Sequence, residues 1–464
     1  MNCFRFFPFL FYLYLTKHFS YSPTFVLYVL LYSYTPWIHH FHSYRPFNFM
    51  TIEKSQKNNF APLSFLTEDD LKNLDNYKYH AGVYTPFDNF MSPIYGRLVY
   101  LLPDWLAPNA VTIIGLLVNI VAFLFIAYYD PYLEGTAPGW VYFYAAFANT
   151  FYQVFDCLDG KQARRLGASS PLGQIFDHGC DSFNLSLIII TLMSATGLGV
   201  TRVSSTLFLI CSCAFALAQL IEYYTGVLLC GSSLFGVSEA LVCTSLIYLI
   251  AGVYGTSFVH QSIHTLLPTF PYEVSIIDLV LIIGCVIIVV TCIVSFVGPL
   301  ISGTTVEPSE RGNKSLTRFD YIQRLLPLMY IFFFFFYIVV LWRAVLSISL
   351  NNLSSMTIPF SICVSYSLCF DWLVLCGFSF SFFSTRCNIA HLTCKPISWR
   401  FNGILPLALY TIVAYLGKAN STTLYMCLGF IVALYGYFVL SCIDQIKHHL
   451  HIRCLHLTAT SKSK

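Results

Sequence analysis

Charged residues are scarce in this sequence. Asp, Glu, Lys and Arg together make up 10% of the 464 residues, hydrophobic residues make up 57%, and the mean hydropathy is +0.67. Soluble globular domains carry about 25% charged residues, so this composition excludes that class and indicates a protein that lies in a bilayer. The net charge of +3 is small, and we expect no nucleic acid among the partners.

Cysteine pairs with the spacing of a metal site are lacking too. The 17 cysteines lie mostly in apolar stretches, so we interpret them as small buried hydrophobic residues and not as a disulfide framework. A signal-peptide cleavage site is also not evident in residues 1–49, which are aromatic and interrupted by prolines. Because the polar stretch TIEKSQKNN follows Met50, we expect residues 1–49 to be an upstream extension and Met50 to be the true start.

Long hydrophobic runs predict an all-α integral membrane protein with about ten transmembrane helices. Lys and Arg gather in the loops after the second, sixth and eighth runs and in the C-terminal tail, whereas the opposite loops hold only Arg202 and Lys418. Positive loops stay in the cytosol, so we expect both termini there. The expected spans are 110–128, 139–158, 182–200, 204–225, 234–253, 275–300, 326–350, 356–383, 401–416 and 422–442.

These runs also divide the chain into parts. After the extension we expect a cytosolic segment with an interfacial helix over 50–106, then a group of helices over 107–300 that holds an acidic motif. A cytosolic loop over 301–325, further transmembrane helices over 326–443 and a basic cytosolic tail over 444–464 complete the chain.

The acidic motif, DCLDGKQARRLGASSPLGQIFDHGCD, runs from Asp156 to Asp181. On a helix, Asp156, Asp159, Gly160, Ala163 and Arg164 share one face, and Gly173, Asp177 and Asp181 share the face of a second helix. The stretch 166–171 reads as a tight turn, so the two acidic faces can meet.

Four converging carboxylates repel one another unless cations lie between them. Ligands that are all oxygen favour hard ions, and four carboxylates suffice for two Mg²⁺ or Mn²⁺ ions. Gly160 and Gly173 leave room for a ligand to approach the backbone. Arg164 offers a planar fork for phosphate, and the predicted site therefore binds a phosphorylated substrate through metal ions.

The motif resembles the signature of the CDP-alcohol phosphotransferase family at every fixed residue and in every gap. The stretches DGKQARR and FDHGCDS are similar to its eukaryotic choline/ethanolaminephosphotransferase branch. The resemblance implies the fold of this family and residence in the endoplasmic reticulum or the Golgi, and the positive loops place the active site on the cytosolic side. It implies transfer of phosphocholine or phosphoethanolamine from CDP-choline or CDP-ethanolamine to diacylglycerol, and assembly as a homodimer.

The resemblance also implies roles for individual residues. Asp156, Asp159 and Asp177 would bind one metal ion, and Asp156, Asp177 and Asp181 the other. Three residues of the motif, Gly160, Ala163 and Arg164, would line the CDP site. Asn109, in the segment Trp105 to Asn109, would contact the CDP-alcohol, whereas the residues alone also allow a simple helix cap there.

The sequence offers more than one candidate for the base that accepts the proton of the acceptor hydroxyl. His178 has a pKa range suited to accepting a proton, and the resemblance to the eukaryotic branch implies that this histidine acts together with a glutamate at the position of Gln174. An amide at Gln174, one turn before His178, can orient the imidazole but cannot raise its basicity. Asp181 is the alternative base, and Glu222 offers another carboxylate if its helix packs nearby.

Two other functions stay open at this point. One is a CDP-alcohol phosphotransferase with a different donor or acceptor, such as a phosphatidylinositol synthase. The other is a non-catalytic membrane protein, against which the retention of all four aspartates together with Arg164 argues. The sequence does not distinguish choline from ethanolamine, because no aromatic cage can be singled out.

Overall fold

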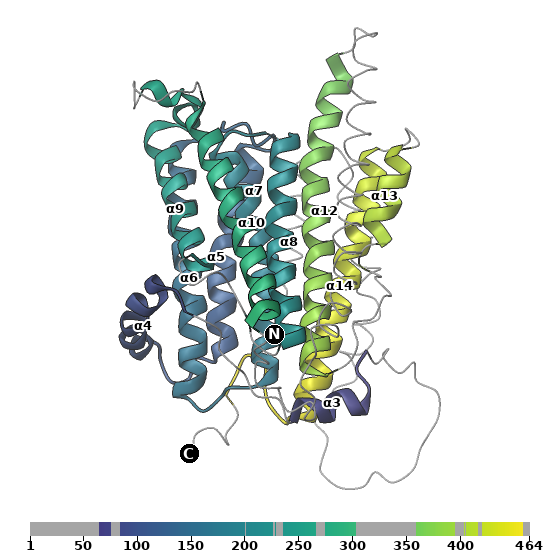
Figure 1. The fold of residues 1–464 in the computed structure, drawn as a ribbon. Helices are drawn as coiled ribbons and strands as arrows, with labels where there is room; N and C mark the ends of the chain where they lie inside the picture. The colour runs from purple at the N-terminus through teal and green to yellow at the C-terminus, as the bar shows by residue number, and fades with distance from the viewer. Residues whose placement is uncertain are drawn as a thin grey trace. The chain divides into compact units, whose positions relative to one another are not determined.

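Helices account for nearly all the regular structure of the described residues. The computed structural model describes residues 65–75, 84–199, 201–225, 228, 235–265, 274–302, 359–394, 403, 405–415 and 420–457. The predicted start at Met50, residues 303–325 of the predicted loop and the predicted span 326–350 lie outside them. The helices (Figure 1) are α3 (Glu68–Asp75), α4 (Pro86–Leu98), α5 (Pro108–Tyr129), α6 (Gly139–Arg165), α7 (Pro171–Ala195), α8 (Arg202–Thr225), α9 (Val237–Tyr254), α10 (Ile276–Ser302), α12 (Pro359–Leu392), α13 (Leu405–Tyr415) and α14 (Ser421–His449), with short 3₁₀ turns at Val99–Leu101, Thr256–His260 and Ile263–Thr265.

Five of the ten expected spans have a helix that is long and apolar enough to cross a membrane. These are Pro108–Tyr129, Val203–Tyr223, Val237–Tyr254, Phe370–Leu392 and Ser421–His449. The expected spans 139–158 and 182–200 do form helices, α6 and α7, but these carry the acidic motif and are not among the five. The all-α class is therefore confirmed for the described residues, while ten spans and the orientation of the termini stay predictions.

Helices α6 and α7 lie at the centre of the packing that concerns the site. Helix α6 packs against α5 and α9, and α7 packs against α5 and α12. Helix α8 packs against α7, α10 and α12, and α14 packs against α12 (Figure 1). The motif is thus surrounded by helices from both halves of the chain.

The connection between α6 and α7 is short, as the turn signal predicts. Gly167 has a φ of +59°, a conformation that suits a residue without a Cβ. Ser170 then caps α7, since its hydroxyl accepts a hydrogen bond from the Gly173 amide at 3.2 Å, and Pro171 fills the first turn. These local signals fix where the second acidic helix begins.

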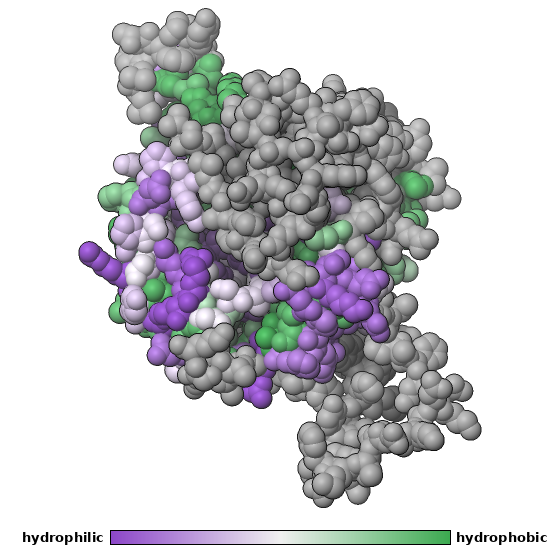
Figure 2. Space-filling model, turned by 60° about the horizontal axis from the view of Figure 1, so that its bottom comes forward, coloured by the Kyte–Doolittle hydropathy of each residue, from purple (hydrophilic) through white to green (hydrophobic). Residues whose placement is uncertain are grey.

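Thr67 caps the N-terminus of α3. The Asp70 amide donates to the Thr67 hydroxyl at 3.3 Å, and the Thr67 amide donates to Asp70 Oδ2 at 2.7 Å, which is a capping box. An apolar cluster holds α3 against α7, α12 and α14, and it includes Leu74, Leu172 and Ile446, each 1% exposed or less. Viewed from the end of the bundle where α3 lies, patches of hydrophilic residues appear on the described surface (Figure 2).

Candidate active site

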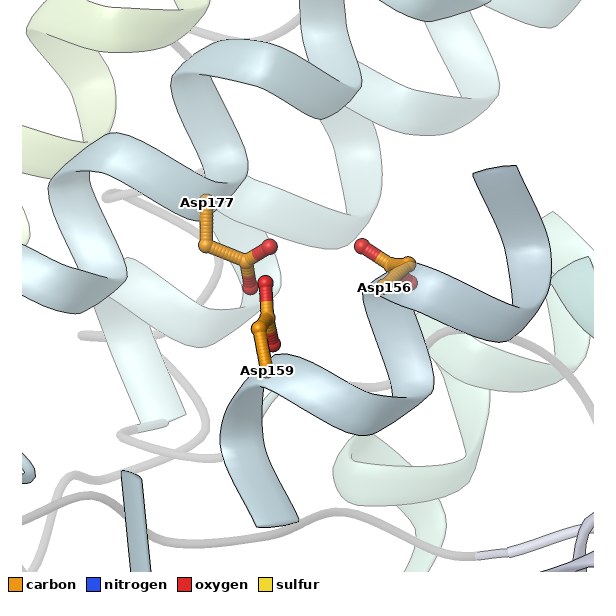
Figure 3. Close-up of side chains that lie close together, drawn as sticks. All are labelled: Asp156, Asp159 and Asp177. Carbon is orange, nitrogen blue, oxygen red and sulfur yellow. The ribbon is translucent and has the colours of Figure 1, made fainter. Parts of the chain in front are cut away.

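Three carboxylates of the acidic motif meet between α6 and α7. One oxygen each of Asp156, Asp159 and Asp177 lies within 4.8 Å of the others. Figure 3 shows Asp156 and Asp159 projecting from one helix toward Asp177 on the other. The predicted convergence of the two acidic faces is therefore present in the structure.

Neighbouring hydroxyl groups orient two of the four aspartates. The Thr112 hydroxyl on α5 donates a hydrogen bond to Asp159 Oδ2. The Tyr152 hydroxyl on α6 donates to Asp181 Oδ1 at 2.6 Å. Asp181 does not belong to the group of three, although it lies beside Asp156. Hydrogen bonds of this kind commonly hold the ligating carboxylates of a metal site in a fixed orientation.

The remaining carboxylate oxygens fit a divalent cation. Asp156 Oδ1 and Asp177 Oδ1 are buried and have no hydrogen-bond partner among the described residues, and an unpaired buried carboxylate oxygen is costly. Asp159 and Asp177 lie beyond the ends of the expected spans. Burial is the main cause that holds the pKa of each carboxyl well above its usual value, and the charge of a neighbouring aspartate is the second cause. A hard cation between the oxygens removes this repulsion, and its ligand set is the one that Mg²⁺ and Mn²⁺ prefer.

The predicted phosphate fork lies one turn beyond the aspartates on α6. A Cβ at Gly160 would lie 3.5 Å from Arg164 Nη1, so the guanidinium folds back over the glycine. Among the described residues, no hydrogen bond or ion pair holds the Arg164 guanidinium. Its neighbour Arg165 differs, because it donates to the main-chain oxygens of Val99 and Leu102 at 2.9 and 2.8 Å. Arg165 thus anchors the chain, whereas Arg164 is available to a ligand.

Asn109 lies at the start of α5, directly after Pro108, as the sequence predicts. Its side-chain amide donates to the main-chain oxygen of Cys454 at 3.0 Å. Its Oδ1 would lie 3.7 Å from a Cβ at Gly173. Asn109 therefore joins the N-terminal ends of α5 and α7 to the C-terminal segment.

The predicted contact between Gln174 and the base candidate takes a different form. The side-chain amide of Gln174 donates to Glu222 Oε1 at 2.9 Å, so its hydrogen-bond partner is a carboxylate on α8 and not the imidazole. Glu222 Oε2 lies 3.9 Å from His178 Nδ1. The condition that the helix of Glu222 packs nearby is therefore met.

One cavity of about 1860 Å³ is lined by the four aspartates, Arg164, Asn109, Gln174 and His178. Its polar part contains Ala163 and the other predicted site residues, from Asn109 to Asp181. A second part is apolar and extends along α7, α8 and α10. It is lined by side chains such as Leu185, Ile188, Phe215, Ile221, Ile287 and Ile288.

Several residues of this site were missed by sequence reasoning. The C-terminal residues Arg453, Cys454 and His456 line the cavity, although nothing local in their sequence indicates it. Thr112 and Tyr152 were also missed, because a lone hydroxyl in an apolar run carries no pattern of its own. His391 belongs to a stretch, Asn388 to Thr393, that resembles a late segment of the same branch, and it lies 3.7 Å from Glu222.

Comparison with known proteins supports the resemblance. The profile of the CDP-alcohol phosphatidyltransferase family matches residues 105–297, which include the whole acidic motif. Cholinephosphotransferase 1 of Saccharomyces cerevisiae is 28% identical over 408 residues, which cover 84% of this chain and 97% of that protein.

Two further relatives match a shorter part of the chain at higher identity. Ethanolaminephosphotransferase 1 of Homo sapiens is 34% identical over 206 residues, 42% of this chain and 51% of that protein. Cholinephosphotransferase 1 of Xenopus laevis is 35% identical over 193 residues, 41% of this chain and 47% of that protein. These alignments span about half the length of the two relatives, whereas the yeast alignment spans nearly all of its partner.

Proposed function

We propose that this chain, whose residues 105–297 match the profile of the CDP-alcohol phosphatidyltransferase family, belongs to that family and is a choline/ethanolaminephosphotransferase. It transfers phosphocholine or phosphoethanolamine from the CDP-alcohol to diacylglycerol and releases CMP. The observation that carries this proposal is the cavity, in which the acidic motif meets an apolar compartment. The relatives named above support the choice of substrates.

The carboxylates of α6 and α7 would hold the metal ions of the family. Asp156, Asp159 and Asp177 fit one Mg²⁺ or Mn²⁺ ion, as their spacing of 4.8 Å or less and the unpaired buried oxygens indicate. We propose a second ion on Asp156, Asp177 and Asp181. When bound, such ions neutralise the charge of a diphosphate and stabilise its displacement.

The residues around the ions would bind and orient the nucleotide. Arg164 donates its guanidinium to a phosphate, and Gly160 and Ala163 leave space beside it. Asn109 and Gly173 close the same end of the cavity. A guanidinium with open space beside it suits an anionic ligand with a polar head, and a CDP-alcohol is such a ligand.

The apolar part of the cavity suits the lipid acceptor. Leu185, Ile188 and Phe215 line it, so acyl chains can lie there while the free hydroxyl reaches the carboxylates. We propose His178 as the base that receives the proton of this hydroxyl, with Asp181 as the alternative. His178 lines the cavity. The residue is only 6% exposed, which keeps water from competing for that proton.

The setting of the enzyme is part of the same proposal. The Lys and Arg distribution supports a multi-pass protein with both termini and the acidic motif on the cytosolic side, where CDP-alcohols occur. The resemblance supports residence in the endoplasmic reticulum or the Golgi and assembly as a homodimer. Protease protection in sealed microsomes tests the orientation, and mass photometry in nanodiscs tests the homodimer.

A head-group transfer assay tests the activity directly. Purified protein in detergent receives diacylglycerol, Mg²⁺ and labelled CDP-choline or CDP-ethanolamine, and the label in phospholipid is measured. We expect transfer from at least one donor, its loss with Asp156→Ala, which removes a ligand of both ions, and its loss with chelator. No transfer by folded protein would contradict the proposed donors, and transfer to inositol from CDP-diacylglycerol would support the alternative enzyme.

A further inference from the structure

A buried carboxylate lies directly behind the proposed base. Glu222 on α8 is 3% exposed and is not part of the cavity lining. It lies between α7 and α12, and its two oxygens face different partners. Oε1 accepts the Gln174 amide at 2.9 Å and lies 3.7 Å from His391 Nε2, while Oε2 lies 3.9 Å from His178 Nδ1.

The two histidine partners of Glu222 are themselves buried, so they fix its position more firmly than the partners in an ion pair at the surface do. Gln174, His178 and His391 come from two helices, α7 and α12, and the two histidines are 6% and 5% exposed. Asn388 on α12 also donates to the main-chain oxygen of Gln174 at 3.2 Å, which joins α12 to the same turn of α7. A carboxylate buried in this way orients what it binds, because bulk water does not compete for it.

We propose that Glu222 is a positioning residue that holds His178 in one tautomer and one orientation. This inference rests on the proposed function. Within the part of the chain that the structure describes, His178 Nδ1 has no hydrogen-bond partner, and the 3.9 Å separation from Glu222 Oε2 is longer than a hydrogen bond. A shift of about 1 Å brings Glu222 Oε2 within range, and such bonds commonly tighten only when substrates are bound.

The consequence concerns the other ring nitrogen. A carboxylate is an acceptor only, so its partner Nδ1 must carry the hydrogen, and Nε2 of the neutral ring then holds the lone pair. In the transfer, the acceptor hydroxyl forms a bond to phosphorus, the bond from phosphorus to the CMP oxygen breaks, and the hydroxyl proton moves to Nε2. Glu222 remains a carboxylate throughout.

The Gln174 and Glu222 pair allows an exchange that keeps its hydrogen bond. Glu222→Gln removes the charge at constant shape. The double variant Gln174→Glu, Glu222→Gln places the carboxylate on α7, one turn before His178 and on the same helical face. A merely structural role for Glu222 would not predict that the double variant recovers turnover.

We expect Glu222→Gln to lower kcat at least tenfold while the KM of each substrate stays within about twofold. The double variant should return kcat to within about threefold of the wild type. Asp371→Asn is the matched control, because it removes another buried carboxylate, from α12, whose hydrogen-bond partner is Tyr425 at 2.7 Å. It should leave kcat unchanged. An unchanged kcat in folded Glu222→Gln would overturn the proposal.

A spectroscopic measurement separates this inference from the proposed function. In protein labelled with ¹⁵N-histidine, the His178 signals are assigned by their absence in His178→Gln. We expect the hydrogen on Nδ1 in the wild type and a mixture of tautomers in Glu222→Gln. If the wild type transfers no head group, the proposed function fails, and the tautomer still decides the role of Glu222. An identical tautomer in both proteins would overturn that role.

Discussion

The side-chain amide of Asn109 donates a hydrogen bond to the main-chain oxygen of Cys454 at 3.0 Å. The two residues are 345 positions apart, and the bond places the C-terminal segment over the first turn of α5. Arg453 and His456 on either side of Cys454 line the same cavity. The C-terminal segment therefore forms one wall of the proposed nucleotide site.

Loss of this bond should weaken binding of the CDP-alcohol. We expect Asn109→Ala to raise the KM of the CDP-alcohol about tenfold, because one hydrogen bond to the wall and a proposed ligand contact are lost. Cys454→Ala is the control: it removes only the long contact from the Asn109 amide to Sγ, at 3.7 Å, and keeps the main-chain acceptor, so KM should stay close to the wild-type value. A chain that ends at Ile452 should raise KM as Asn109→Ala does. Wild-type KM values in both changed proteins would contradict a role for this wall.

The hydroxyl of Tyr152 should control the affinity for the second metal ion. It donates to Asp181 at 2.6 Å, and loss of such a partner commonly lowers metal affinity 10–100-fold. We expect Tyr152→Phe to raise the Mg²⁺ concentration for half-maximal activity at least severalfold, with kcat at saturating Mg²⁺ little changed. Tyr142→Phe, which removes a hydroxyl bonded to Ser194, should leave the Mg²⁺ titration unchanged. Identical titrations of Tyr152→Phe and the wild type would argue against Asp181 as a ligand.

Spacing within the sequence predicts the acidic cluster because the cluster is local. Asp156 and Asp159 share a helical face, and so do Asp177 and Asp181. The short connection of residues 166–170 leaves the two helices adjacent. The periodicity of α6 and α7 and the turn at Gly167 therefore suffice to predict that these carboxylates meet.

The contacts that complete the site are not local, and the sequence does not predict them. Glu222 contacts Gln174 across 48 positions, and the bond from Asn109 spans most of the chain. Such contacts depend on which helices pack together, and hydropathy specifies only that a helix is apolar. Hydropathy also predicts α6 and α7 as ordinary membrane spans, although their carboxylates belong to a cavity and not to a lipid-facing surface.

Gly160 should tolerate a methyl group in folding but not in nucleotide binding. A Cβ there would meet only the Arg164 guanidinium, at 3.5 and 3.8 Å, and alanine favours a helix over glycine by roughly 0.5–1 kcal/mol. We expect Gly160→Ala to keep or raise the melting temperature and to raise the KM of the CDP-alcohol at least tenfold. Gly436→Ala on α14, where a Cβ would have nothing within 4 Å, should leave KM unchanged. A normal KM in Gly160→Ala would show that no ligand approaches this turn.

The adjacent arginines Arg164 and Arg165 should respond differently to the same substitution. Arg165 donates to Val99, to Leu102 and, at 2.8 Å, to Asp104, so lysine cannot replace its planar fork. Arg165→Lys should therefore lower the melting temperature by about 1–2 °C, for a loss of about 1–2 kcal/mol, with KM nearly unchanged. Arg164→Lys should keep the melting temperature, because no described residue holds its guanidinium. It should lower kcat/KM for the CDP-alcohol at least tenfold, because a lysine binds phosphate as a point charge and not through two parallel bonds. Thermal unfolding and steady-state kinetics on both variants measure the two effects, and the reverse pattern would assign the phosphate to Arg165.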